Sequence, residues 1–257
     1  MNFILTYCSR LETDRRWRMI AIWLIIGAAL LLRIMYSFCH PAIDRDEFFY
    51  LQKAMDFAQN GNWELLKFQP FLPVFLAAML TKVGHLADVG AALPVMRSFS
   101  AVLGSAGIIF VYPIGKMLFS SRRYALFLLA VAAVHPTLVM YGGVFLRESL
   151  ALPLAPLTIY GMLQLLHRPN FIWALLLGAV IAIGGSCRTE YPEFLFYALL
   201  GAAMAPKCRE QWPRRLLIGI VLLTSFAAIY LLLPLICGGP FDLTVGRFMS
   251  SLRYYCQ

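Results

Sequence analysis

The chain has 257 residues, of which 61% are hydrophobic and 14% are charged, and its formal net charge is +9. A soluble domain contains roughly 45–50% apolar and about 25% charged residues, so a water-soluble core of this length cannot bury so much apolar surface. The composition also excludes a disordered chain, and six cysteines in this length exclude a disulfide-stapled miniprotein. We therefore predict a membrane protein, in which the positive charge indicates topology and not a nucleic-acid partner.

Apolar segments that can cross a bilayer contain about 20 residues, within a range of roughly 17–25. Six segments have this character, and a shorter seventh, 192–205, is acceptable if it is tilted or sheltered by its neighbours. The six are residues 19–38, 94–119, 124–142, 150–166, 171–187 and 216–236. Residues 68–80 are apolar but short and contain Pro70 and Pro73, so they predict an interfacial or re-entrant helix.

These segments predict an all-α fold: a polytopic membrane helical bundle with about seven transmembrane helices. One membrane domain covers residues 1–257, with interfacial helices in a long first outer loop, 39–93, and an outer C-terminal tail, 237–257. The first span is expected to be a retained anchor, because its apolar stretch is longer than that of a cleaved signal peptide. Arg33 lies near the outer end of this span, where we expect it to snorkel to the interface.

Positive charge decides which loops are cytoplasmic. With a cytoplasmic N-terminus and residues 68–80 not crossing, the inner side carries twelve basic residues against three acids. The alternative, in which 68–80 crosses, places the basic cluster of Lys116, Arg122 and Arg123 outside. The balance favours the first topology and a multi-pass protein of a bacterial inner membrane.

Acidic residues gather in the first outer loop, where residues 44–50 predict the start of a helix. Asp44 or Asp46 can cap it, because a carboxylate accepts hydrogen bonds from the free N–H groups of a first turn. Asp46, Tyr50 and Lys53 then share one side of the helix, and residues 60–62 end it. Either this is an ordinary amphipathic helix, or its acids serve a site at the mouth of the bundle.

Two short outer turns also carry charge: Arg147-Glu148, and Arg188 with Glu190. Ionisable groups near membrane depth usually pair, face a cavity or take part in chemistry. They are either interfacial ion pairs or the lining of one outer cavity shared with Asp46 and Glu47. Carboxylates and guanidinium groups together suit acid/base work beside an anionic group such as a phosphate.

In their order along the chain these residues resemble the GT-C glycosyltransferases, the polyprenyl-phosphate-sugar-dependent enzymes of family 39 type. That group includes protein O-mannosyltransferases and lipid A aminoarabinose transferase. The similar segments of the first outer loop are His40-Pro41, Asp46-Glu47, Tyr50, residues 60–63 and Gln69-Pro70. Later ones are residues 97–104, residues 115–119, residues 146–149 and residues 187–190, so the likeness covers residues 17–236.

The resemblance implies inverting transfer of a sugar from a polyprenyl-phosphate donor to an acceptor (a lipid, glycan or protein) at the outer membrane face. It gives Asp46 the role of general base, with Glu47 beside it and Asp44 as the competing position. Glu148 joins this catalytic set. Substrate-binding roles fall to Asp44, Tyr50, Arg147, Arg188 and Glu190, with the arginines facing the donor phosphate.

Some members of the group use a divalent metal, for which Asp46 and Glu148 have suitably hard oxygen ligands. Other members need none, so no metal site is assigned.

Members of the group usually continue for several more spans, so the likeness covers only the N-terminal catalytic module. The alternatives are a non-catalytic or truncated module, and a subunit that needs a partner. A small transporter is a further alternative, but the charges cluster on one face and no repeat is visible.

Overall fold

A computed structural model describes residues 14–40, 42–66, 71–204 and 212–240. Every regular element within these ranges is a helix, and none is a strand. Among the described residues, four helical segments are long and apolar enough to cross a membrane, or five if one bent pair counts as a single span. The predicted fold class, an all-α polytopic membrane bundle, is confirmed.

The four long spans begin and end close to the predicted positions. They are α2 (Arg15–Cys39), the run from α5 (Val89–Gly107) through η2 (Ile108–Phe110) to α6 (Val111–Leu118), α9 (Arg147–His167) and α12 (Trp212–Ile236). The bent pair is α7 (Arg122–Val134) with α8 (Pro136–Gly143), which meet at 52°. Pro136 explains the break, since it lacks an N–H and the residue before it, His135, avoids the helical conformation.

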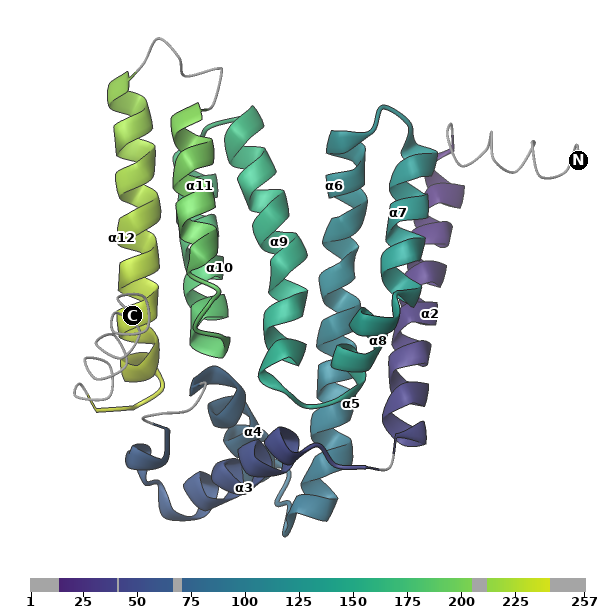
Figure 1. The fold of residues 1–257 in the computed structure, drawn as a ribbon, viewed down its shortest axis with the longest axis vertical. Helices are drawn as coiled ribbons and strands as arrows, with labels where there is room; N and C mark the ends of the chain where they lie inside the picture. The colour runs from purple at the N-terminus through teal and green to yellow at the C-terminus, as the bar shows by residue number, and fades with distance from the viewer. Residues whose placement is uncertain (1–13, 41, 67–70, 205–211, 241–257) are drawn as a thin grey trace, which may run out of the picture.

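The count of seven spans is not confirmed, because two of the predicted ones are short helices. They are α10 (Phe171–Cys187), with 17 residues, and α11 (Glu193–Met204), with 12. At 1.5 Å per residue these helices reach about 25 Å and 18 Å, against roughly 30 Å of hydrocarbon. Both nevertheless lie in the bundle beside α9 and α12 (Figure 1).

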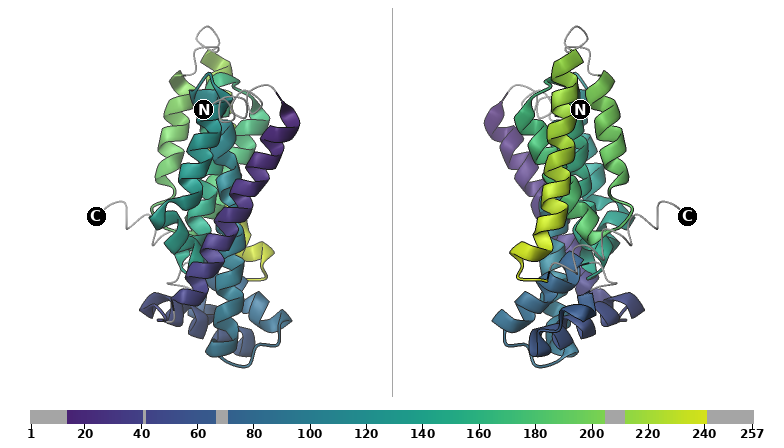
Figure 2. Two further views of the ribbon diagram at one scale, coloured as in Figure 1. Left: turned by 90° about the vertical axis from the view of Figure 1, so that its right-hand side faces the viewer. Right: turned by 90° about the vertical axis from the view of Figure 1, so that its left-hand side faces the viewer.

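The first outer loop forms a small layer at one end of the bundle. It contains α3 (Arg45–Asn60), η1 (Trp63–Leu66) and α4 (Phe71–Val83), and α3 packs on α4 across the ends of the longer helices (Figures 1 and 2). The α8–α9 and α10–α11 turns point toward this layer, as do the ends of α2 and α12. The α6–α7 and α9–α10 turns lie at the opposite end. The predicted grouping of loops on two sides thus agrees with the arrangement of the helices.

Local signals fix the ends of α3 as predicted. Asp44 is the N-cap, and its side chain accepts a hydrogen bond of 2.9 Å from the backbone N–H of Asp46. Gly61 closes the helix with φ of 63°, a left-handed conformation that costs glycine no Cβ clash. The sequence left either acid open as the cap, and the structure assigns that role to Asp44.

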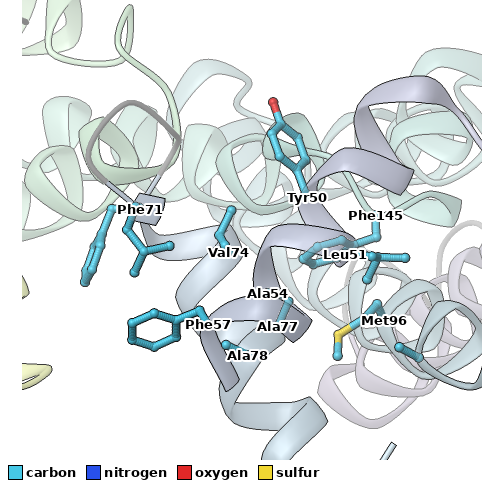
Figure 3. Packing of buried hydrophobic residues seen from close by; sticks show 12 residues of the cluster. Tyr50, Leu51, Ala54, Phe57, Phe71, Val74, Ala77, Ala78, Met96 and Phe145 are labelled. Carbon is cyan, nitrogen blue, oxygen red and sulfur yellow. The ribbon is translucent and has the colours of Figure 1, made fainter. Parts of the chain in front are cut away.

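An apolar cluster holds the α3–α4 layer to the bundle. Leu51 and Ala54 of α3 pack against the inner face of α4, and Met96 of α5 and Phe145 from the α8–α9 turn complete the cluster (Figure 3). Tyr50 belongs to the same cluster, but its hydroxyl oxygen points away from the apolar side chains in Figure 3. The apolar cluster therefore packs the α3–α4 layer against the bundle, and the Tyr50 hydroxyl group points away from that cluster.

Arg33 is not at the interface, where snorkelling was expected. Its side chain is 1% exposed and lies inside the bundle. There Nη1 donates one hydrogen bond of 2.9 Å to the carbonyl oxygen of Ala29 and another of 3.4 Å to the carbonyl oxygen of Ala133. Ala133 is close to the α7–α8 break, and a guanidinium at a helix C-terminus meets its unpaired carbonyls and negative dipole end. The bend between α7 and α8 therefore leaves a backbone carbonyl oxygen, that of Ala133, available to Arg33 inside the bundle.

The outer tail predicted for residues 237–257 is described only to Pro240, and the rest lies outside the described residues.

Candidate functional site

The site begins at the first turn of α3, where two acids have different surroundings. The Asp44 carboxylate is used as the helix cap. Asp46 is exposed, and no hydrogen bond or ion pair within the described part of the chain engages its carboxylate. Asp46 is therefore the acid of this turn that is open to a ligand.

Glu47, the next residue, lies in a different environment, because its side chain is fully buried. Its Oε1 accepts 2.9 Å from Nε of Arg97 and its Oε2 accepts 2.6 Å from Nη2. Oε1 also accepts 2.8 Å from the backbone N–H of Phe145. Such a two-pronged Arg–carboxylate pair fixes geometry as well as charge.

Arg97 completes this buried junction by donating to three backbone carbonyls. Nη1 donates to His40 at 2.6 Å and to Ser37 at 3.2 Å, and Nη2 donates to Ala42 at 2.9 Å. With the two bonds to Glu47, all five guanidinium N–H donors are used. The Glu47–Arg97 pair therefore joins the end of α2, the start of α3, α5 and the α8–α9 turn at one point.

Four charged side chains from two turns form a second group, which we call the charge cluster: Arg147, Glu148, Arg188 and Glu190. Glu148 Oε1 lies 3.0 Å from Arg147 Nε and 3.8 Å from Arg188 Nη1. Arg188 Nε lies 3.1 Å from Glu190 Oε2. The arginine side chains are 38% and 39% exposed, so they keep N–H donors for a ligand.

Electrostatics connects the charge cluster to α3 through Tyr50. Burial raises the pKa of the Tyr50 phenol; the charge of Arg147 opposes this shift, and those of Asp46, Glu148 and Asp44 add to it. Tyr50 is therefore a neutral hydroxyl at neutral pH, within reach of charges from both α3 and α9.

Glu190 stays ionised for a related reason. Burial alone would raise its pKa, but hydrogen bonds from its own backbone N–H and from Arg188, with the charges of Arg188 and Arg147, outweigh burial and lower the pKa. Glu190 is therefore a carboxylate at neutral pH, beside the guanidinium group of Arg188.

A cavity of about 250 Å³ opens beside the charge cluster. One wall is the small-residue face of α9, at Ala151 and Ala155, and the other includes Arg188, Glu190 and the start of α11. Tyr191 also lines it, and its hydroxyl lies 2.7 Å from the Thr158 hydroxyl of α9. A pocket with charged groups at one end and an apolar wall suits a ligand with a polar head and an apolar chain.

The structure thus places all eight predicted site residues at one end of the bundle, and it groups the side chains of seven near the charge cluster: Asp44, Asp46, Tyr50, Arg147, Glu148, Arg188 and Glu190. Glu47 is the exception, since its carboxylate is enclosed by Arg97 and does not face the outside. Arg97 was not predicted as the partner of Glu47. The signal was an arginine within an apolar span, the same feature that singled out the two charged turns.

Tyr191 was also missed, and no feature of the sequence distinguishes it from an ordinary interfacial tyrosine. The described residues contain no group of three or more His, Cys, Asp or Glu side chains placed to hold a metal ion.

The fold and the site define a multi-pass membrane protein in which the charge cluster and the acids of α3 lie at one end of a helical bundle. A comparison with protein families identifies it further. The sequence model of one family, described as dolichyl-phosphate-mannose-protein mannosyltransferase, matches residues 69–236, which are most of the chain. The chain belongs to this family of GT-C membrane glycosyltransferases. No curated protein matches the chain. The match includes the charge cluster and Arg97, whereas Asp44, Asp46, Glu47 and Tyr50 precede it.

Proposed function

We propose that this protein transfers a sugar from a polyprenyl-phosphate donor to an acceptor at the outer face of the membrane, with inversion at the anomeric carbon. The observation that carries the proposal is the charge cluster, in which Arg188 and Glu148 join two turns next to α3. Family membership supports the glycosyl-transfer chemistry. The N-terminus lies in the cytoplasm of a bacterial cell, and the α3–α4 layer lies outside its inner membrane.

The arginines of the charge cluster bind the donor phosphate. Each is partly exposed and already oriented by a glutamate, so its remaining N–H groups can donate charge-assisted hydrogen bonds to phosphate oxygens. The cavity beside Arg188 takes the first isoprene units along the face of α9. As the glycosidic bond breaks, negative charge grows on the phosphate, and fixed positive groups stabilise it.

Asp46 is the general base that removes the acceptor hydroxyl proton as the new glycosidic bond forms. Its exposed carboxylate has no competing partner among the described residues, whereas Asp44 is occupied as a helix cap. Tyr50, on the same side of α3, offers a substrate oxygen a neutral hydroxyl that feels the charges of both Asp46 and Arg147. Glu148 orients both arginines, and Glu47 acts indirectly, by holding the first turn of α3 against α5.

The test is transfer from a radiolabelled polyprenyl-phosphate sugar in membranes, together with direct donor binding. Asp46→Asn keeps the shape of the side chain but cannot accept a proton, so turnover should fall about 10²–10⁴-fold while the donor stays bound. Arg188→Ala should weaken donor binding as well as slow turnover. Asp44→Asn is the matched control, because asparagine caps a helix about as well as aspartate.

The outcomes separate the alternatives. Full activity in Asp46→Asn with loss in Asp44→Asn would move the base by two positions. Full activity in both variants would remove the first-loop acids from the chemistry. A wild-type chain that is inactive alone but active with a co-expressed subunit would favour a module that depends on a partner.

A further inference from the structure

Arg33 carries a polar group that the proposed reaction does not use. Its side chain is 1% exposed in the core between α2, α5 and α8, and no carboxylate among the described residues pairs with it. Nη1 donates to two backbone carbonyls, but the buried Nε has no hydrogen-bond acceptor in the described residues. A buried N–H without an acceptor is destabilising, so this atom calls for an oxygen partner.

The guanidinium lies in a cradle formed by two glycines. A Cβ placed on Gly142 would lie 2.6 Å from Nε of Arg33, and one on Gly104 would lie 3.3 Å from it. Neither position accepts a side chain without displacing the guanidinium or the neighbouring backbone. The absence of side chains at these two residues is what allows a charged group so deep in the bundle.

Arg33 and Gly142 line a cavity of about 30 Å³, and α9 forms part of its wall through Ser149, Leu152, Pro153 and Pro156. The two prolines remove backbone N–H groups from α9. In a regular helix the N–H at 153 would bind the carbonyl oxygen of Ser149, and that at 156 would bind the carbonyl oxygen of Leu152. The residues that lose their intrahelical donors are thus themselves part of the wall.

We propose that this cavity is a bound-water site, in which water accepts from Nε of Arg33 and donates to the freed carbonyl oxygens of α9. A cavity needs about 10–15 Å³ to hold one water, so this one holds about two. Oxygen acceptors from α9 would repel an anion. The Ser149 hydroxyl also donates to the Leu146 carbonyl at 2.6 Å, so its proton is not available to an anion. Water can both donate and accept hydrogen bonds, which matches a donor on the Arg33 side of the cavity and carbonyl acceptors on the α9 side.

The test is X-ray radiolysis of the full chain in detergent, which oxidises buried side chains only where a bound water lies beside them. Ile108 lines the cavity and is 3% exposed, and Leu129, at 0%, packs in the same apolar cluster away from it. We expect oxidation of Ile108 to exceed that of Leu129 several-fold. Equal, background oxidation of both side chains would show a dry cavity and overturn the proposal.

Two variants test the role of Arg33. Arg33→Met removes the donor at similar length, and Gly142→Ala crowds Nε, so each should bring Ile108 oxidation down to the level of Leu129. Gly27→Ala on α2 is the matched control, since a Cβ there meets nothing within 4 Å, and it should keep the wild-type pattern. Wild-type oxidation of Ile108 in both Arg33→Met and Gly142→Ala would show that Arg33 does not hold the water.

The identity of the occupant is tested by exchanging chloride for gluconate. A water site predicts the same melting temperature for the wild-type chain in both salts. A melting temperature that depends on chloride in the wild type, and not in Arg33→Met, would identify an anion and overturn the assignment to water.

Discussion

Glu47 and Arg97 form a buried ion pair that connects α3 to α5, with Nη2 and Oε2 2.6 Å apart and Nε and Oε1 2.9 Å apart. Asp46 is adjacent to Glu47 in the chain, yet it is exposed and unpaired within the described residues. Two neighbouring acids in one helical turn therefore have separate tasks, one structural and one open to substrate. This division leads to the first prediction.

Glu47→Gln should lower the free energy of unfolding by about 3–5 kcal/mol, because it leaves the buried Arg97 charge without its counterion. Asp46→Asn should change it by less than about 1 kcal/mol, since Asp46 is exposed and contributes only through the helix dipole. Chemical denaturation in detergent measures both. Equal stability losses for the two variants would contradict the assignment of Glu47 to the junction.

Asp44→Ala should lower the free energy of unfolding by about 0.5–2 kcal/mol, because the backbone N–H of Asp46 loses its hydrogen-bond acceptor at the helix start. Asp44→Asn should leave stability almost unchanged, since asparagine accepts the same hydrogen bond. Unfolding of the two variants side by side isolates the cap. A loss in Asp44→Asn as large as in Asp44→Ala would show that the charge, and not the hydrogen bond, stabilises this turn.

Gly107→Ala should disturb the contact between α5 and α9, because a Cβ at Gly107 would lie 2.4 Å from Cα of Pro153. Backbone atoms cannot move aside as a flexible side chain does, so the expected cost is about 1–3 kcal/mol. Gly201→Ala is the control, since a Cβ there meets nothing within 4 Å. A Gly107→Ala variant as stable as the control would show that the two helices separate easily.

The topology is tested by labelling single cysteines from outside in a cysteine-free background. A cysteine at His85, in the turn between α4 and α5, should react, and one at Ser121, between α6 and α7, should be protected. The expectation rests on the excess of basic residues predicted for the inner side. The reverse pattern would invert the orientation and place the charge cluster in the cytoplasm.

The sequence by itself determined the class of the fold, the positions of the long spans and the placement of the charged turns on one side. These follow from hydropathy, charge and capping, which depend only on neighbouring residues. The sequence did not decide whether Asp44 or Asp46 caps α3, because either carboxylate can reach a free N–H of the first turn. The sequence predicted about seven spans, and that count is not confirmed, because α10 and α11 are short helices.

Only the tertiary structure decided the partners of the buried charges. Glu47 and Arg97 are 50 residues apart, and Arg33 and Ala133 are 100 apart, so no local pattern connects them. The meeting of Arg188 with Glu148 likewise depends on how α9 and α10 pack. A buried charge needs a partner that satisfies it, but which partner lies nearby is set by helix packing, where small residues such as Gly142 allow close approach.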